Sequence, residues 1–369
     1  MTSDFHSKPF DENTQVKLTL FQSYLREWLP VFLAPRNGFI STVNVFDFFC
    51  GPGRDINGKP GSPLITMKEL GGYYHNIISK KISVNLFFNE LKKRKIQCLE
   101  KIIATERKTN KPYTILTSHF EFKESFEKYL PLMTKPATAN FLFLDQTGVK
   151  HITKDVFQTI INLNTTDFLF FISSSTVHRF SGLDEISKYI PIDKKNVSDT
   201  EYLNIHRAVY DYYKSLIPAY RSDYHLASFS IKKGANIYGL IFGSGHARGI
   251  EKFLRKCWAL DPERGEANFD IDHDNIDHSQ PSLFPEHNRP KKVILFEEEL
   301  REGILNGSLK TNIDVYYFTI QSGFLPKHAR EAFMSLIEQK ILPKQVFRIS
   351  YDTCVKNKNI SQIQGVVNE

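Results

Sequence analysis

The residues best suited to chemistry are an acid and a glycine turn in the segment Asp47-Phe-Phe-Cys-Gly-Pro-Gly53. A hydrophobic run at 43–49 leads into this turn, and a new segment opens at Ser62-Pro63. A glycine-rich turn between a strand and a helix lets the backbone approach a ligand closely. In a parallel α/β sheet such a turn lies at the carboxyl edge, where ligands bind. We therefore expect the turn to bind a cofactor.

The residues around the turn indicate which cofactor it is. A phosphate-binding Walker loop needs Lys-Ser or Lys-Thr at its last glycine, and a dinucleotide loop needs a third glycine where Ile56 stands. The spacing instead favours S-adenosylmethionine. Gly51 and Gly53, with Cys50 beside them, would make room for its methionyl and ribose groups, and Asp47 would pair with its amino group. The alternative is a structural aspartate beside a turn.

Two further strand ends carry polar residues that suit an adenosyl group. The hydrophobic run 83–90 ends in Glu90, and the run 113–120 ends near Ser118 and His119. An acid at the tip of the strand next to the glycine turn can hydrogen-bond both ribose hydroxyls. The alternative is that Glu90 caps the helix that follows. We assign contacts with the adenine to Ser118 or His119.

Asp145 lies at the tip of the predicted strand 140–148, at the edge where the acceptor of a transferred group would lie. It could orient a nucleophile or accept its proton. Because a sulfonium methyl group is already electrophilic, positioning can supply most of the acceleration. The run reads Asp-Gln-Thr-Gly rather than Asp-Pro-Pro-Tyr, the type that holds an exocyclic amine. Methylation of a base amine therefore has no direct support.

Strands and helices alternate along the first two thirds of the chain, and the strands are continuous hydrophobic runs. This pattern is typical of buried parallel strands and predicts a doubly wound, mostly parallel Rossmann-like α/β sheet. We expect a first helix at 14–33 that ends or kinks at Pro30, and a helix that Ser62 caps. Two runs joined by Lys233-Gly234-Ala235-Asn236 predict an antiparallel hairpin that closes the sheet.

The predicted domains are a Rossmann-like domain at 1–260 with a helical insertion at about 182–220, a linker at 261–292, and a winged-helix-like domain at 293–369. The last rests on three helices, 294–306, 312–322 and 326–340, and on two short strands within "ILPKQVFRIS". The linker contains "DIDHDNIDH", which we interpret as solvated acids rather than a metal site.

A net charge of +7 and a pI of about 9.0 over 369 residues favour a polyanionic partner only mildly. Candidate phosphate contacts, and so candidate substrate-binding residues, are basic side chains near the glycine turn, in the helix "LKKRK" and in the last predicted helix: Arg54, Lys93, Arg94, Lys327 and Arg330. These residues would bind DNA or RNA without reading its sequence.

Four scattered cysteines show neither metal-binding nor disulfide spacing, which favours a reducing, cytoplasmic location. The polar N-terminus is not a signal peptide, and no apolar run is long enough to span a bilayer. We predict no membrane association and no bound metal.

Several motifs together resemble the three-Cys-motif partner proteins, TcmP. They are "DFFCGPGRDINGKPGSPL", "FLFLDQTG", "YGLIFGSGHARGIEKFLRKCWALDP" and "GFLPKHAREAFMSLIEQKIL". The resemblance implies an S-adenosylmethionine methyltransferase-like fold in bacteria and mobile elements. It also implies a partner with a three-cysteine motif, similar to radical S-adenosylmethionine iron–sulfur proteins. Asp47, Gly51, Gly53 and Asp145 match the motifs, whereas Cys50 stands for Ala and Gln146-Thr147 for Pro-Phe.

Three functional hypotheses remain open from the sequence. The first is an S-adenosylmethionine-dependent methyltransferase that acts on nucleic acid or a nucleotide. The second is a non-catalytic adaptor that binds nucleic acid or the iron–sulfur partner. The third is a metal-dependent nuclease that uses Asp145 and Glu90, although these acids lack the clustering that two metals need.

Overall fold

The computed structural model describes residues 9–34, 39–106, 111–146, 149–180, 202–277, 279–280, 282 and 288–365. These residues form two compact units. The first comprises Met1–Tyr224 and Ile231–Gly245, and the second comprises His225–Ser230 and His246–Glu369. The predicted boundary at residue 260 therefore differs from the one observed. Of the predicted insertion at 182–220, residues 182–201 lie outside the described part.

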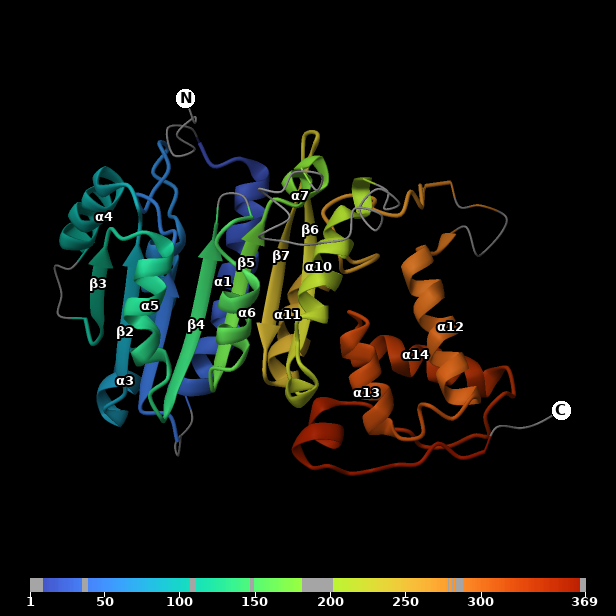
Figure 1. The fold of residues 1–369 in the computed structure, drawn as a ribbon. Coiled ribbons are helices and arrows are strands. Elements are labelled where there is room, and N and C mark those ends of the chain that lie inside the picture. The colour runs from blue at the N-terminus through green and yellow to red at the C-terminus, as the bar shows by residue number, and fades with distance from the viewer. Residues whose placement is uncertain are drawn as a thin grey trace. The chain divides into compact units, whose positions relative to one another are not determined.

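The chain forms a seven-stranded sheet in the order β3-β2-β1-β4-β5-β7-β6, and all strands except most of β6 belong to the first unit (Figure 1). Strands β1 to β5 pair in parallel, whereas β7 is antiparallel to β5. The strands are β1 (Thr42–Asp47), β2 (Ser83–Asn89), β3 (Thr114–Ser118), β4 (Thr138–Asp145), β5 (Thr166–Ile172), β6 (His225–Lys233) and β7 (Asn236–Ser244). The predicted doubly wound sheet and its antiparallel closing pair are confirmed. The chain order reverses between β1 and β4, which makes their carboxyl ends the switch point.

A row of buried asparagines fixes the register of the central strands. The Asn85 amide donates to Asn44 Oδ1 at 3.0 Å, and the Asn44 amide donates to Asn140 Oδ1 at 3.1 Å. Asn44 is directly opposite both residues in the two ladders. Because an unpaired buried amide is costly, a slip of one residue would break this row. The carboxyl ends of β1, β2 and β4 are thereby held level.

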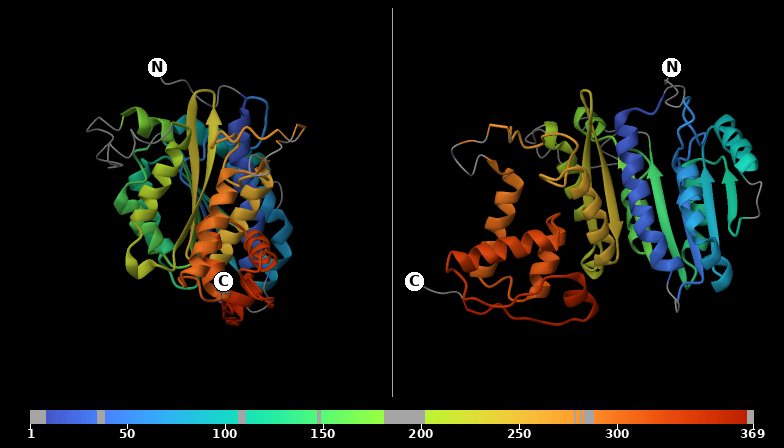
Figure 2. Two further views of the ribbon diagram at one scale, coloured as in Figure 1. Left: turned by 90° about the vertical axis from the view of Figure 1, so that its right-hand side faces the viewer. Right: turned by 180° about the vertical axis from the view of Figure 1, so that it is seen from behind.

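Helices cover both faces of the sheet, with α1 on one face and α5 and α6 on the other (Figures 1 and 2). The helices of this unit are α1 (Glu12–Leu33), α2 (Ser62–Leu70), α3 (Tyr74–Lys80), α4 (Lys93–Glu106), α5 (Phe122–Met133), α6 (Lys154–Ile161), α7 (Ser174–Phe180) and α10 (Ile205–Ser215). Helix α1 continues for three residues beyond Pro30, as in the predicted range 14–33, so the helix does not end at this proline. The fully buried Leu29 and Leu33 keep its last turn packed.

The second unit contains α11 (Ala247–Leu260), α12 (Lys291–Leu305), α13 (Asn312–Gln321) and α14 (Pro326–Glu338). The three predicted C-terminal helices are confirmed. The two strands expected at 341–350 do not form in the described residues, so a winged helix is not observed. Instead, the amide of buried Asn312 donates to the carbonyls of Arg348 and Asn359, and its oxygen accepts from the Ser361 amide. One side chain thus takes hydrogen bonds that a strand partner would otherwise make.

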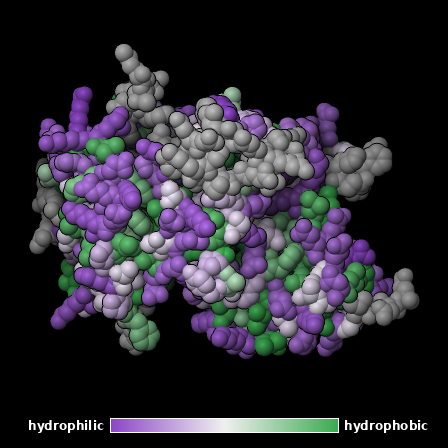
Figure 3. Space-filling model, viewed as in Figure 1, coloured by the Kyte–Doolittle hydropathy of each residue, from purple (hydrophilic) through white to green (hydrophobic). Residues whose placement is uncertain are grey.

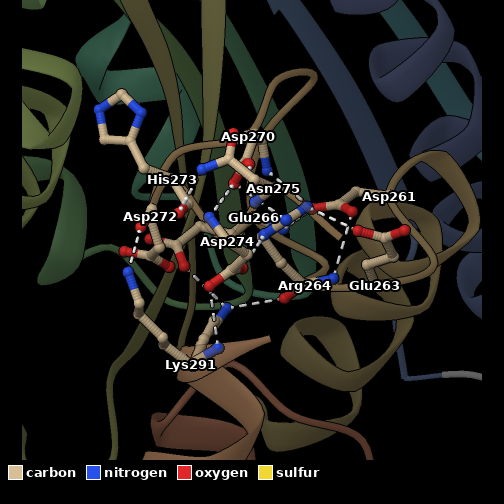
Figure 4. A network of polar contacts seen from close by, with 12 residues as sticks. Asp261, Glu263, Arg264, Glu266, Asp270, Asp272, His273, Asp274, Asn275 and Lys291 are labelled. Atoms are coloured by element: carbon tan, nitrogen blue, oxygen red, sulfur yellow. Dashed lines mark hydrogen bonds and ion pairs between the residues drawn. The ribbon is translucent and has the colours of Figure 1, made fainter. Parts of the chain in front are cut away.

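The acid-rich segment 261–277, predicted to be part of a linker, is organised around Arg264 (Figure 4). The guanidinium pairs with Glu263, Asp270 and Asp274 at 2.8–2.9 Å, and its side chain is only 7% exposed. A charge this buried is tolerated because every partner is an anion. The sequence alone suggests a solvated loop, because Arg264 lies several residues before Asp270 and Asp274, the acids that it pairs with. In the described part of the chain, no group of His, Cys, Asp and Glu could hold a metal ion.

Candidate active site

The turn between β1 and α2 requires glycine at two positions. Gly51 and Gly53 have φ angles of 63° and 89°, in the region that favours glycine. A Cβ atom on Gly53 would lie 2.7 Å from the Leu99 Cδ1 of α4. The carbonyl of Gly53 also accepts from the Gly61 amide at 2.8 Å, which closes the turn. The backbone here is therefore bent tightly and held in place.

Replacement of Gly53 by Ala should lower the free energy of unfolding by about 2–3 kcal/mol. The left-handed backbone accounts for about 1 kcal/mol, and the contact with Leu99 adds the rest. Gly58→Ala is the matched control, because its φ is 79° but nothing lies within 4 Å of its added Cβ. Urea unfolding of both variants measures the difference. If both variants lose the same free energy of unfolding, the contact between the added Cβ and Leu99 does not affect stability.

Asp47 ends β1 and is almost completely buried, with 1% of its surface exposed. The Ser62 hydroxyl donates to Asp47 Oδ2 at 2.6 Å, and the Phe49 amide donates to Oδ1 at 3.2 Å. Burial, together with the negative charge of Asp145, raises the pKa of Asp47 to about 7 against these hydrogen bonds. Gly61, rather than Ser62, is the N-cap of α2. The prediction for Ser62 is therefore wrong, because its hydroxyl serves Asp47.

Lys17 of α1 forms an ion pair with Asp145 at the end of β4, with Nζ 2.5 Å from Oδ2. The two side chains are 10% and 25% exposed. The Lys17 ammonium also lies 4.7 Å from the centre of the Phe171 ring. Sequence reasoning did not identify Lys17. Its position one turn before the buried Phe21, on the apolar face of the helix, is the signal that could have revealed it.

Asn89, the last residue of β2, connects the ends of three neighbouring strands. Its amide donates to the Phe48 carbonyl at 3.3 Å and to the Phe120 carbonyl at 3.0 Å. Its oxygen accepts from the Ser118 hydroxyl and the Phe120 amide. This residue was also missed, and it fixes the loops after β1 and β3.

Glu90 and His119 lie at the tips of β2 and β3, as predicted. Glu90 Oε1 accepts from the Lys92 amide at 3.0 Å, so the carboxylate caps the segment before α4. The Glu90 amide donates to the Ser118 carbonyl at 3.1 Å. Glu90 is half-buried and His119 is exposed. Both side chains are thus accessible from solvent at adjacent strand ends.

Cys50 is buried within the turn, and its amide donates to the Asn89 carbonyl at 3.0 Å. Burial and the charges of Asp47 and Glu90 raise the pKa of the Cys50 thiol well above its ordinary value. A thiol that stays protonated is a poor nucleophile. Cys50 therefore shapes the turn through its backbone and small side chain.

Gln146 follows Asp145 and is buried. Its oxygen accepts from the His151 amide at 3.1 Å, while its buried amide nitrogen has no hydrogen-bond partner among the residues that the structure describes. The His151 ring packs against the rings of Phe49 and Phe122, with centres 5.2 and 5.4 Å apart. Burial lowers the pKa of His151 to about 4, so its ring is neutral at pH 7. These residues were not predicted from the sequence, and residues 147–148 lie outside the described part.

The five predicted phosphate contacts divide between the two units. Arg54 is partly engaged, because it donates to the Gly58 carbonyl and pairs with Glu106 at 3.1 Å. Lys93 and Arg94 are exposed at the start of α4, where hydrophilic side chains gather (Figure 3). Lys327 and Arg330 are exposed on α14 in the second unit.

No helix within the described ranges is long and apolar enough to cross a bilayer. All four cysteines carry free thiols, and Cys98 is the exposed one.

The sequence matches no model of a known protein family, and a search of curated proteins finds no similar sequence. Among solved structures, the chain is similar to Trm1 from Pyrococcus horikoshii in complex with S-adenosyl-L-methionine, with 9% identity and a TM-score of 0.38. That match covers 69% of this chain and 61% of Trm1, so the chain spans about three fifths of that protein. An O-methyltransferase from Bacillus cereus matches with 14% identity and a TM-score of 0.34, over 64% of this chain and 91% of that one. The strand order, with β7 antiparallel, is that of the S-adenosylmethionine-dependent methyltransferase fold, and this chain has a methyltransferase-like fold.

Proposed function

We propose that this protein is an S-adenosylmethionine-dependent methyltransferase that acts on nucleic acid. One observation carries the proposal: Asp47 is a buried carboxylate at the switch point of a methyltransferase-like sheet, beside a turn whose backbone favours glycine. Within the described residues, its hydrogen-bond donors are two neutral groups, the Ser62 hydroxyl and the Phe49 amide. A buried carboxylate without a direct cationic partner is costly. A cationic ligand would provide that partner.

The residues around the turn fit the cofactor part by part. The bare backbone of Gly51 and Gly53 leaves room for the methionyl chain, and Asp47 supplies the charge that its ammonium needs. Glu90 would accept from the ribose hydroxyls, and Ser118 and His119 lie at the next strand tip. When bound, S-adenosylmethionine supplies an electrophilic methyl group on a sulfonium. The protein must then orient the acceptor, and Asp145 is the polar group at that edge.

The nucleic-acid part of the proposal rests on charge. The run Lys92 to Lys95 begins two residues after Glu90, so four cationic side chains follow closely on the candidate cofactor site in the chain. Phosphate contacts of this kind position a nucleic acid without reading its sequence. The net charge of +7 has the same sign. Lys327 and Arg330 on α14 offer a second set of cations in the other unit.

The resemblance to TcmP supports a further part of the proposal, namely a partner protein with a three-cysteine motif that binds an iron–sulfur cluster. The motifs that carry it include the turn with Asp47 and the β4 end with Asp145. Co-purification of the two proteins from one host would test the pairing. If a tagged copy of neither protein retains the other, the proposed partner is wrong.

S-adenosylmethionine should bind about tenfold more tightly at pH 8 than at pH 6. With a pKa of about 7, Asp47 is mostly ionised at pH 8 and mostly protonated at pH 6. A cationic ligand favours the ionised form, so binding at pH 6 must release close to one proton. Calorimetry in two buffers of different ionisation enthalpy measures both the affinity and the proton release.

Asp47→Asn is the control for this measurement, because the ligand's own amino group also titrates in this range. The variant should bind more weakly and lose the proton release. If Asp47→Asn binds S-adenosylmethionine with the affinity of the wild type, Asp47 does not belong to the binding site. Transfer of a labelled methyl group to nucleic acid then separates an enzyme from an adaptor that only binds.

A further inference from the structure

The Lys17–Asp145 pair indicates which kind of atom receives the methyl group. We propose that the acceptor is a hydroxyl oxygen, the ribose 2′-hydroxyl of RNA, and that Lys17 and Asp145 bind it together. This inference rests on the proposed function and makes it more specific. Lys17 has no role in the sequence-based hypotheses, yet it is the side chain that contacts Asp145.

The hydrogen-bonding capacity of the pair matches a hydroxyl and not an amine. A hydroxyl has one proton to donate and lone pairs to accept with, so it can donate to Asp145 while it accepts from Lys17. An exocyclic amine presents two N–H donors and must direct its lone pair at the methyl group. The Lys17 ammonium offers three donors and no acceptor. An amine beside it would share the Asp145 carboxylate with this ammonium, which already donates to Oδ2.

The buried amide of Gln146 is a second hydrogen-bond donor close to Asp145 in the chain. Among the described residues, its nitrogen is a donor without a hydrogen-bond partner, on the residue directly after Asp145. In the described part of this edge, the side chains of Lys17 and Gln146 next to Asp145 are therefore donors, and the Gln146 nitrogen is closed off from solvent. An oxygen-rich group such as ribose can accept from the Lys17 ammonium. The nucleobase amines have no lone pair to spare for this purpose.

The chemistry of the transfer also distinguishes the two acceptors. A neutral amine that gains a methyl group becomes an ammonium ion, which is stable and can lose its proton later. A hydroxyl that gains a methyl group would become a protonated ether, which is a very strong acid. Its proton must therefore leave as the new bond forms. A carboxylate at the acceptor position serves this need by accepting the proton as the new bond forms.

The proposed step is balanced as follows. The hydroxyl oxygen forms a bond to the methyl carbon, the bond between that carbon and sulfur breaks, and its electron pair stays on sulfur as a neutral thioether. The hydroxyl proton passes to the Asp145 carboxylate and from there to water, which reaches the 25% of this side chain that is exposed. Lys17 donates to the acceptor oxygen and stabilises the negative charge that develops on it. Among intact nucleic acids, RNA carries such a hydroxyl at every nucleotide and DNA does not.

The first experiment identifies the methylated atom. Wild-type protein, labelled S-adenosylmethionine and either total bacterial RNA or genomic DNA are incubated, digested to nucleosides and separated by chromatography. We expect the label in 2′-O-methylated nucleosides from RNA. Label on a base, label in DNA, or cofactor binding without label in RNA would each overturn the inference while leaving the methyltransferase fold and cofactor site intact. Failure of the cofactor to bind in calorimetry would instead remove the proposed function itself.

The second experiment tests the pair with Lys17→Met, Lys17→Arg, Asp145→Asn and the double variant Lys17→Met/Asp145→Asn. The double variant leaves no unpaired charge, so it keeps the test valid if a single variant folds poorly. We expect kcat for RNA to fall about 100-fold in Lys17→Met and in the double variant, and about tenfold in Lys17→Arg. The dissociation constant of the cofactor should stay within about threefold. A purely structural role for Lys17 would instead weaken cofactor binding and leave kcat unchanged.

Discussion

Replacement of Asp47 by Asn should raise the free energy of unfolding at pH 8 by as much as about 4 kcal/mol. The ordinary pKa of an aspartate is 3.8, and burial raises that of Asp47 to about 7. In the unfolded chain the group ionises freely, whereas in the folded protein the charge is buried. The stability that this group contributes is complete below pH 3.8 and is lost as the pH rises through 7. Asn carries no charge, so the variant avoids the loss.

The pH dependence makes this prediction specific. At pH 4.5 the gain in Asp47→Asn should shrink to about 1 kcal/mol, because the folded wild type is protonated there and the unfolded chain is only partly ionised. Urea unfolding at both pH values measures the two gains. A variant less stable than wild type at pH 8, or a gain that does not change with pH, would contradict the assignment of a buried, costly charge.

Asp55→Asn is a matched control with the opposite sign. Burial opposes ionisation of this residue, but the backbone amides of Phe10, Lys59 and Asn57 donate to it and hold its pKa below the ordinary value. Its charge therefore stabilises the fold above pH 3.8, and Asp55→Asn should lower stability at pH 8. Asp47 ends β1, and Asp55 lies in the segment that follows, between β1 and α2. If removing a negative charge had only a general effect, the free energies of unfolding of both variants would change in the same direction.

Asp47→Asn should also weaken S-adenosylmethionine binding by about 100-fold, since a buried partner of a charged group contributes about 3 kcal/mol. A substitution that stabilises the protein and removes binding is expected where a residue is kept for function. A structural aspartate would show the reverse, with lower stability and no effect on the cofactor. The two measurements together decide between these interpretations.

Arg264→Met should destabilise the second unit by about 3–5 kcal/mol. The substitution leaves Glu263, Asp270 and Asp274 without the cation that they surround, and breaking a buried ion network on one side is strongly destabilising. Hydrogen exchange in the full chain should show faster exchange of the backbone amides at 261–277. The Asp274 and Asn275 amides, which donate to Asp270, report on the loop directly.

Arg289→Met is the control for Arg264→Met. Arg289 pairs with Glu297 at 2.5 Å, but the two side chains are 46% and 34% exposed. An exposed pair contributes less than about 1 kcal/mol. Equal exchange rates at 261–277 in wild type and Arg264→Met would show that the acids of this loop are simply solvated, as the sequence suggested.

The framework of the fold was predictable because its signals are local. Strand β4 is a continuous apolar run whose first seven residues are buried, as expected for a parallel strand covered on both faces. The glycines at 51 and 53 follow β1 directly, so their place at the sheet edge follows from the strand. Asp145 is located by the same reasoning at the end of β4. Each of these predictions needs only a few neighbouring residues.

The parts that were missed depend on contacts between distant segments. Lys17 and Asp145 are 128 residues apart, and only the packing of α1 on the sheet brings them together. Asn89 resembles any polar residue after a strand until the ends of β1 and β3 are placed beside it. The strands expected at 341–350 fail for the same reason, because Asn312, well before them in the chain, takes their hydrogen bonds. Such contacts leave no periodic pattern in the sequence.

The loop between β1 and α2 closes on itself. Its own backbone bonds, from Gly61 to Gly53 and from Asp55 to Lys59, hold its shape, and Arg54 and Pro60 form a bridge across it. A ligand that binds to this preformed loop need not order the backbone, so binding requires no slow conformational step after the first encounter. Analogues of different affinity should then arrive at nearly equal rates and differ in how long they stay. Changes in this loop would therefore alter the dissociation rate of the ligand more than its association rate.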